Sequence, residues 1–158
     1  MKLTKLMTVA VAALCAVLTS CGSKEKTWKS EDKVHAVATS TMVADMVRVI
    51  GGDQVEVIGR RDPSVDPHDY AQTFEDTAAI NSADVVFSSG LHLAGTMPDG
   101  LEKRSAKGEN VYAVTDAIPA EAVLGEHLSH DPHVWGDPEL WAHTIDAVVK
   151  GLTAVDAA

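Results

Sequence analysis

The feature that most constrains the fold is a repeated alternation of short apolar runs with stretches of helical period. The apolar run 34–38 is followed by hydroxyl residues suited to helix capping at 39–41, and then by apolar residues at helical spacing from Met42 to Ile50. Gly51-Gly52 ends that helical stretch. The same pattern continues along the chain: strands are predicted at 55–58, 84–88 and 111–114, and helices at 73–82, more weakly at 101–105, and from 138 to the end.

This alternation favours an α/β fold. Short strands separated by helices are joined by right-handed crossovers, so we expect a parallel four-stranded sheet flanked by helices. The last helix begins near Pro138, a residue suited to a first helical turn, and continues to Ala158 with no capping residue and no following strand. We therefore predict that the chain ends inside an element and that the apolar face of this helix is incompletely covered.

The N-terminus has the layout of a secretory signal peptide. Lys2 and Lys5 precede a mostly apolar, uncharged run at 6–18, which is too short to span a bilayer comfortably. The tetrapeptide Leu18-Thr19-Ser20-Cys21 resembles a bacterial lipobox, so residues 1–20 are expected to be removed and Cys21 to be acylated. The alternative is an ordinary signal peptide that leaves Cys21 as a free thiol. Residues 21–33 are predicted to form a flexible, lipidated tether, in which Trp28 is incidental.

Cysteine content and charge exclude two further classes of protein. The other cysteine, Cys15, lies in the segment expected to be removed, so no disulfide framework is available. Without Lys2 and Lys5 the chain keeps 11 basic residues against 23 acidic residues, a net charge of −12. Such an acidic surface argues against nucleic acid as a partner.

Two copies of one tripeptide stand out in the predicted loops. Asp66-Pro67-His68 follows the second strand, and Asp131-Pro132-His133 comes well after the fourth. Loops that leave the carboxyl ends of parallel strands gather at one edge of a sheet, where ligands bind. A neutral imidazole nitrogen binds first-row metals, a neighbouring carboxylate can hold the other ring nitrogen, and proline stiffens the backbone.

The remaining histidines are interpreted differently. His127 and His130 precede the second tripeptide and could pass metal toward it, although solvated side chains are the simpler interpretation. His35 and His143 are expected at the surface or in an interface. Trp135 is expected to pack beneath the second tripeptide.

These motifs together resemble a known family. The stretches 65–68, 89–93 and 131–135, the last followed by Asp137-Pro138, are similar to the solute-binding proteins of manganese and zinc ABC importers. The resemblance runs from about residue 34 to residue 152. It implies two α/β lobes joined by one long helix, with the metal held between them by two histidines from the first lobe and two ligands from the second. The matching first-lobe ligands are His68 and His133. Asp66 and Asp131 are expected to support these ligands or to form turns rather than to bind the metal, and His92 is expected to satisfy buried polar groups near the site.

The resemblance divides the chain into a metal-binding lobe at 34–137 and the start of the linking helix at 138–158. The second lobe and its two ligands would lie beyond residue 158, so we expect a truncated chain. Some positions depart from the family: Ser64 replaces a usual glycine, Arg60 and Arg61 replace apolar residues, and Ala94 replaces a frequent glutamate. None of these departures removes a ligand.

The function implied is extracytoplasmic capture of Zn²⁺ or Mn²⁺ and delivery to an ABC permease, by a lipid-anchored protein of the cell envelope that is not an enzyme. Two alternatives remain open: a truncated fragment or interaction module without transport activity, and a secreted metallohydrolase. The sequence lacks the His-Glu-x-x-His and Gly-x-Ser-x-Gly motifs that a hydrolase would favour. Two imidazoles suit zinc, but the metal stays open.

The resemblance also makes a geometric prediction. If both imidazoles bind one tetrahedral zinc at about 2.0–2.1 Å, their ligating nitrogens lie roughly 3.3–3.4 Å apart. Without metal the separation could relax to around 5 Å, because rotamers move more easily than backbones.

Overall fold

The computed structural model describes residues 28–59, 66, 68–93, 101, 104–105, 107–125 and 130–156. The predictions for the signal peptide and for Cys21 lie outside these residues, as do those for Arg60, Arg61, Ser64, Ala94 and His127. Among the described residues, no helix has both the length and the apolar character needed to cross a membrane.

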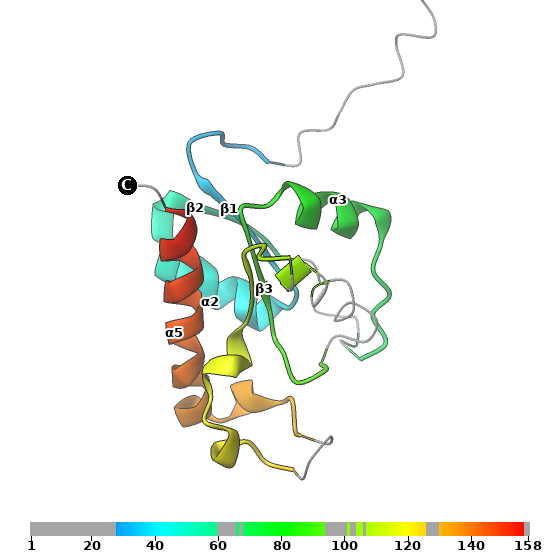
Figure 1. The fold of residues 1–158 in the computed structure, drawn as a ribbon, viewed down its shortest axis with the longest axis vertical. Helices are drawn as coiled ribbons and strands as arrows, with labels where there is room; N and C mark the ends of the chain where they lie inside the picture. The colour runs from blue at the N-terminus through cyan, green and yellow to red at the C-terminus, as the bar shows by residue number, and fades with distance from the viewer. Residues whose placement is uncertain are drawn as a thin grey trace, which may run out of the picture.

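Four parallel strands form the centre of the protein (Figure 1). Their order in the sheet is β2-β1-β3-β4, and every neighbouring pair runs in the same direction. The predicted four-stranded parallel sheet is thus confirmed. The strands are β1 (Val34–Ala38), β2 (Val55–Gly59), β3 (Val85–Ser88) and β4 (Val111–Ala113).

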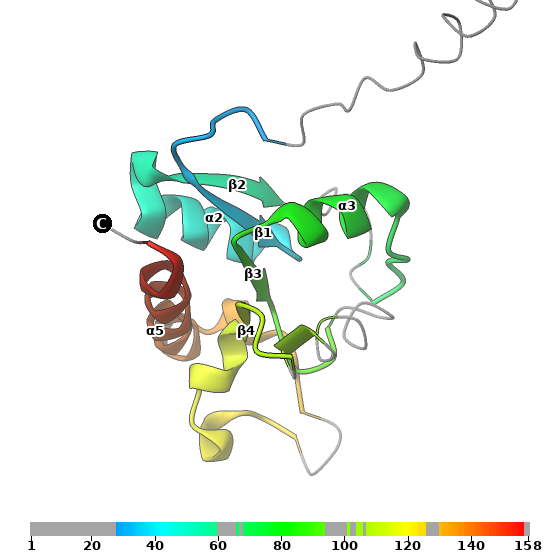
Figure 2. The same ribbon diagram turned by 45° about the horizontal axis from the view of Figure 1, so that its top comes forward.

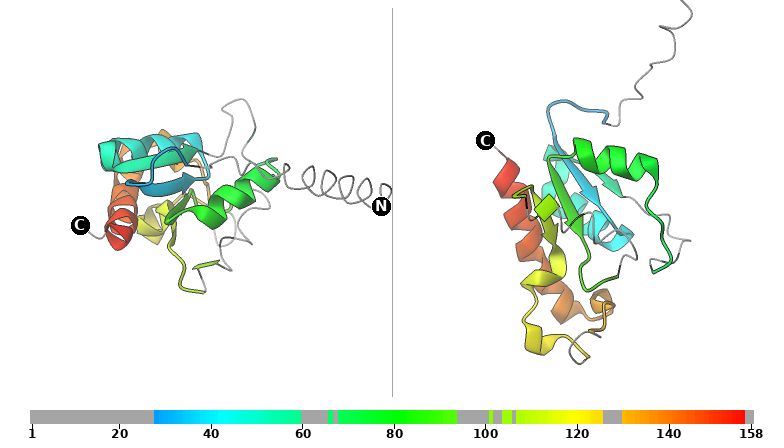
Figure 3. Two further views of the ribbon diagram at one scale, coloured as in Figure 1. Left: turned by 90° about the horizontal axis from the view of Figure 1, so that it is seen from above. Right: turned by 45° about the vertical axis from the view of Figure 1, so that its right-hand side comes forward.

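Helices cover both faces of the sheet (Figures 2 and 3). Side chains alternate between the two faces along a strand, so the residues of β1 show which helices cover each face. Ala36 and Ala38 of β1 pack with α2 and α5 on one face, whereas Val37 packs with α3 on the other. The helices are α2 (Thr41–Gly51), α3 (Phe74–Ser82) and α5 (Pro138–Val155). Four 3₁₀ turns accompany them: η1 (Gly52–Gln54), η2 (Val114–Ala117), η3 (Ala120–Ala122) and η4 (Val134–Gly136).

Local capping chemistry starts both of the first two helices. The Ser40 hydroxyl accepts from the backbone N–H of Val43 at the start of α2. At α3, Thr73 and Asp76 form a reciprocal capping box. The buried Asp76 carboxylate also accepts a hydrogen bond from the Tyr70 hydroxyl. Tyr70 therefore fixes the chain that leads from His68 into α3.

Helix α5 lies very close to the sheet because it carries a glycine at the contact. A Cβ atom on Gly151 would stand 2.5 Å from the Phe87 ring, so only glycine permits this approach. The helix ends at Val155, short of the predicted end at residue 158, and the backbone N–H of Asp156 bonds to the Leu152 carbonyl. On its outer side Ile145 and Val149 are 43% and 42% exposed, which agrees with the predicted incomplete cover.

The segment before β1 differs from the predicted flexible tether over its described part. Trp28 is partly buried, stacks on His35 and donates to Ser82, and the backbone of Lys29 and Ser30 is bound by a side chain of β2. The interpretation of Trp28 as incidental is therefore wrong. These contacts lie at the amino end of the strands.

Candidate metal centre

The carboxyl end of the sheet brings the two repeated tripeptides together. His68 lies between β2 and α3, and His133 directly precedes η4. Their Nε2 atoms are 3.3 Å apart, with ring centroids 5.4 Å apart and ring planes inclined by 59°. Two nitrogens that share a tetrahedral zinc at about 2.0–2.1 Å would be separated by roughly the same distance. The predicted proximity of the two rings is confirmed.

Each histidine is held by the aspartate two residues before it. Asp66 Oδ1 accepts from the backbone N–H of His68 at 2.9 Å, and Asp131 Oδ1 accepts from that of His133 at 3.0 Å. Both tripeptides therefore close the same side-chain-to-backbone turn, which fixes the backbone at each histidine. The repeated sequence thus forms the same hydrogen-bonded turn at both positions.

Asp131 also contacts the ring of His133, whereas no contact is described between Asp66 and the ring of His68. Its Oδ1 lies 2.7 Å from Nδ1 of His133. A carboxylate can only accept, so Nδ1 of His133 carries the proton and Nε2 of the neutral ring presents a lone pair toward His68. The imidazole is thus set in the tautomer that a metal ligand requires.

The same contacts hold Asp131 in its charged form. The backbone N–H of His133, followed by the bond from its ring, lowers the pKa of Asp131 below its usual value of 3.8. The side chains of His133 and Asp131 are 53% and 50% exposed, so the pair opens to solvent. An ion bound by His133 would therefore be open to further ligands from the solvent side.

The backbone that carries His133 is anchored by the residues that follow it. Val134 is buried, and the Trp135 ring meets the His133 ring edge-on at 5.1 Å, as expected for packing beneath the tripeptide. Asp137 then caps α5 by accepting from the backbone N–H groups of Glu139 and Leu140. The second ligand candidate is therefore tied to the start of the longest helix described.

His92 differs from its predicted role as a group that satisfies buried polar atoms. Its side chain is exposed, and its backbone φ is 56°, in the left-handed region, next to Leu91 at 49° and Gly90 at 82°. Gly90 must be glycine, since a Cβ there would stand 2.0 Å from Oγ1 of Thr115. The buried Leu93 closes this turn and points its neighbour His92 outward.

A buried hydroxyl pair, which was not predicted from the sequence, lies at the same end of the sheet. The Ser40 and Ser89 hydroxyls lie 2.9 Å apart and join the chain after β1 to the chain after β3. Beside Ser40, the Thr39 hydroxyl is fully buried and has no hydrogen-bond partner among the described residues. The signal available in the sequence was a hydroxyl residue within two positions of the end of each of two central strands.

Other histidines stand apart from the pair. His143 is exposed on α5, His130 is partly exposed in the loop before Asp131, and His35 lies in β1 at the opposite end of the sheet. Within the described part of the chain, no group of three or more histidine, cysteine, aspartate or glutamate side chains could hold a metal ion. The centre described here therefore offers two imidazole nitrogens.

Known proteins are similar to this chain in both sequence and fold. A family model described as "Zinc-uptake complex component A periplasmic" matches residues 36–158, a range that includes both histidines of the pair. The manganese-binding lipoprotein MntA of Bacillus subtilis is 38% identical over 133 residues, which are 83% of this chain and 43% of that protein. The zinc-binding protein TroA of Treponema pallidum is 34% identical over 146 residues, 91% of this chain and 46% of TroA.

Solved structures of related proteins are similar to this chain in fold. The periplasmic zinc-binding protein TroA from Treponema pallidum superimposes with a TM-score of 0.73 at 34% identity, covering 78% of this chain and 45% of that one. A Mn-bound periplasmic metal-binding protein from candidatus liberibacter asiaticus gives a TM-score of 0.64 at 28% identity, covering 78% and 46%. The chain therefore spans about half the length of the curated relatives it matches.

Proposed function

This chain belongs to the family of the periplasmic zinc-uptake component, metal-binding proteins of ABC transporters rather than enzymes, and from that premise we propose that it captures Zn²⁺ or Mn²⁺ outside the cytoplasm for delivery to an ABC permease. His68 and His133 are the proposed ligands. The observation that carries the proposal is the 3.3 Å separation of their Nε2 atoms. The metal is cargo here, bound and released without chemical change.

The aspartates complete the proposed centre without binding the ion. Asp131 sets the tautomer of His133, and Asp66 fixes the backbone of His68. Two imidazoles provide half of a tetrahedral zinc shell, so the remaining positions belong to water or to groups outside this pair. For that reason we expect the affinity of this chain alone to be well below that of a complete site.

The proposed organisation follows the relatives. Residues 1–20 act as a signal peptide, Cys21 is acylated, and residues 34–137 form the metal-binding lobe, from which α5 continues as the helix that leads to a second lobe. MntA is named a lipoprotein, and PsaA of Streptococcus pneumoniae is named a manganese ABC transporter substrate-binding lipoprotein. These names support an extracytoplasmic, lipid-anchored location with an ABC permease as partner.

We propose Zn²⁺ as the preferred metal and Mn²⁺ as the second candidate. Imidazole nitrogen binds zinc more strongly than manganese along the affinity order of first-row metals, while cellular selection also depends on geometry and supply. Relatives at similar identity are named for manganese or for zinc, so resemblance alone does not decide between the two.

The test is a calorimetric titration of the purified chain, without its signal peptide and with Cys21→Ser, against Zn²⁺ and then Mn²⁺. We expect one zinc site that is lost in His68→Ala and in His133→Ala. His130→Ala and His143→Ala are matched controls, because they remove an imidazole that lies outside the pair. Zinc binding that persists in both ligand variants, or that disappears in the controls, would contradict the assignment.

A further inference from the structure

The rings of the two histidines in the pair are held in different ways. Nδ1 of His133 is bound by the carboxylate of Asp131. Among the described residues, the ring of His68 contacts the ring of His133 and has no carboxylate partner. The position of the His68 ring therefore depends more strongly on the backbone that carries it.

That backbone is fastened to α3 by Tyr70, two residues after His68. The Tyr70 hydroxyl donates to the carboxylate of Asp76, which lies in the first turn of α3. The Tyr70 ring packs against the core cluster that includes Ala79 and Ile80 of the same helix. Both the hydroxyl and the ring of Tyr70 thus tie the His68 segment to α3.

The carboxylate that receives the Tyr70 hydroxyl is itself firmly held. Asp76 is 2% exposed, and its Oδ2 also accepts from the backbone N–H and the hydroxyl of Thr73, at 2.8 and 2.9 Å. Hydrogen bonds to a carboxylate are stronger than those between neutral groups. Asp76 therefore gives Tyr70 a fixed point of attachment at the start of a helix.

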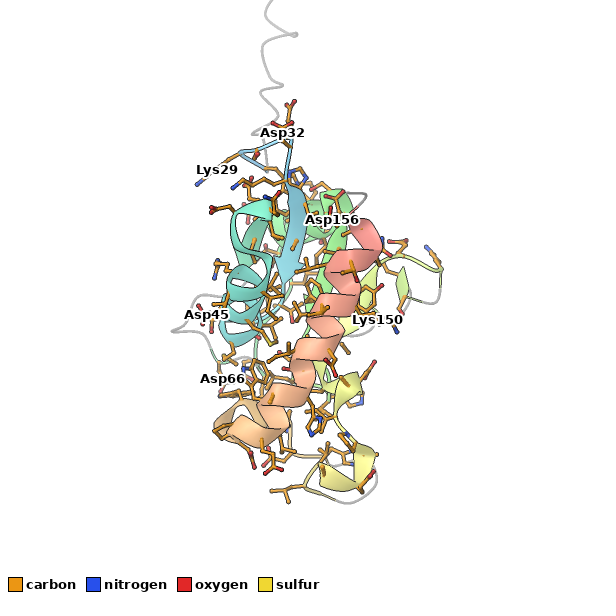
Figure 4. All side chains as sticks on the ribbon, turned by 90° about the vertical axis from the view of Figure 1, so that its left-hand side faces the viewer. Lys29, Asp32, Asp45, Asp66, Lys150 and Asp156 are labelled. Atoms are coloured by element: carbon orange, nitrogen blue, oxygen red, sulfur yellow. The ribbon has the colours of Figure 1, made fainter. Side chains whose placement is uncertain are left out.

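The second histidine has a comparable support. Four residues after His133, Asp137 accepts from two backbone N–H groups at the start of α5. Figure 4 shows Asp66, just before His68, toward the end of the molecule where α5 begins, with Asp156 toward the other end. Each histidine is thus followed by a carboxylate that caps a helix, and in the first tripeptide the link to that carboxylate is the Tyr70 side chain.

We propose that Tyr70 is a positioning residue of the metal centre. By fastening the His68 segment to Asp76, its hydroxyl holds Nε2 of His68 at the distance from Nε2 of His133 at which the two can share an ion, and so raises the affinity for zinc. Tyr70 does not bind the ion. The proposal rests on the proposed function, in which this pair binds metal.

The size of the effect follows from the fraction of molecules in the competent arrangement. The apparent affinity of a site falls in proportion to that fraction. If loss of the hydroxyl leaves His68 in place in about one tenth of the molecules, zinc binding weakens by about tenfold. A ligand set must be held close to its productive geometry by its supporting contacts, which is the role assigned to Tyr70.

The first test is calorimetric zinc titration of the soluble Cys21→Ser chain with Tyr70→Phe, which removes the hydroxyl and keeps the ring. The chain has two tyrosines, so Tyr112→Phe is the matched control. The Tyr112 hydroxyl, on β4, has no hydrogen-bond partner within the described part of the chain. We expect about tenfold weaker binding in Tyr70→Phe and parental binding in Tyr112→Phe. Parental binding in Tyr70→Phe would overturn the proposal.

A second variant separates positioning from stability. Thr73→Ala removes the hydroxyl that caps the same helix, but it leaves the bond between Tyr70 and Asp76 in place. Both Tyr70→Phe and Thr73→Ala should lower the urea midpoint of unfolding, and Tyr70→Phe alone should weaken zinc binding. Equal weakening in the two variants would show that only the stability of α3 matters, which would overturn the positioning role.

The third measurement needs no metal. Nuclear magnetic resonance relaxation of the imidazole carbons in the metal-free chain reports the motion of each ring. In Tyr70→Phe the order parameter of the His68 ring should fall, while that of the His133 ring should match the parent. An unchanged His68 ring would contradict the anchor, whereas zinc binding that survives His68→Ala and His133→Ala would contradict the proposed function. The two failures are therefore distinguishable.

Discussion

The carboxylate of Asp131 accepts hydrogen bonds from both Nδ1 and the backbone N–H of His133, at 2.7 and 3.0 Å. The equivalent Asp66 accepts only the backbone N–H of its histidine among the bonds described between them. Asp131 therefore fixes both the ring and the backbone turn of His133, whereas for Asp66 the contact described fixes the backbone turn of His68. This difference between two identical tripeptides leads to the first prediction.

Asp131→Ala is expected to weaken zinc binding more than Asp66→Ala. Loss of the carboxylate that orients a metal-binding histidine costs about 10–100-fold in affinity, whereas loss of the turn contact alone should cost less than about tenfold. Calorimetric titration of both variants measures the two losses. Equal losses would show that the ring contact of Asp131 does not act on the ion.

Two neighbouring valines in α5 provide a matched test of the packing. Val148 is fully buried against the sheet, whereas Val149 is 42% exposed on the outer side. Val148→Ala should lower the free energy of unfolding by about 2 kcal/mol, because it removes two buried methyl groups and leaves a cavity. Val149→Ala should change it by less than about 0.5 kcal/mol. Urea unfolding of the soluble chain measures both values, and similar losses at the two positions would contradict the observed packing of α5.

The hydrogen bonds from the backbone N–H groups of Lys29 and Ser30 to the Glu56 carboxylate should depend on pH. The backbone N–H of Lys29 is the largest cause that lowers the pKa of Glu56 below its usual value of 4.5, and burial partly opposes it. Because the pKa is lower in the folded state than in the unfolded chain, the stabilisation is complete above pH 4.5 and is lost as the pH falls through the folded value.

The amide signals of Lys29 and Ser30 in nuclear magnetic resonance spectra report this titration directly. They should shift together, with a midpoint below pH 4.5, and should not titrate in Glu56→Gln. A midpoint at or above 4.5 would mean that the two amides do not bind the carboxylate in solution.

The sheet and its helices follow from local patterns, which is why they could be predicted. Both ends of each strand lie within one residue of the predicted bounds. Ser40 and Thr73 cap the helices that follow them, as their hydroxyl groups predicted. The proximity of His68 to His133 was predictable for a related reason. Loops at the carboxyl ends of parallel strands share one edge, so residues 65 positions apart could be expected to meet.

The remaining features depend on contacts that no local pattern records. Trp28 donates to Ser82, 54 positions away, and a polar tail of mixed charge gives no sign of that partner. His92 turns outward because three successive residues take positive φ and the buried Leu93 fixes the turn. Apart from Gly90, these residue types rarely adopt that conformation, so the sequence did not predict it. The role of His68 and His133 as ligands stays a prediction.

A crystal structure of the soluble chain soaked with zinc, with anomalous data collected at the zinc edge, tests the central claim most directly. The account predicts one anomalous peak about 2.0–2.1 Å from Nε2 of His68 and from Nε2 of His133, with water at the open positions. A peak bound to only one of the two rings, or zinc held elsewhere with both rings free, would contradict it.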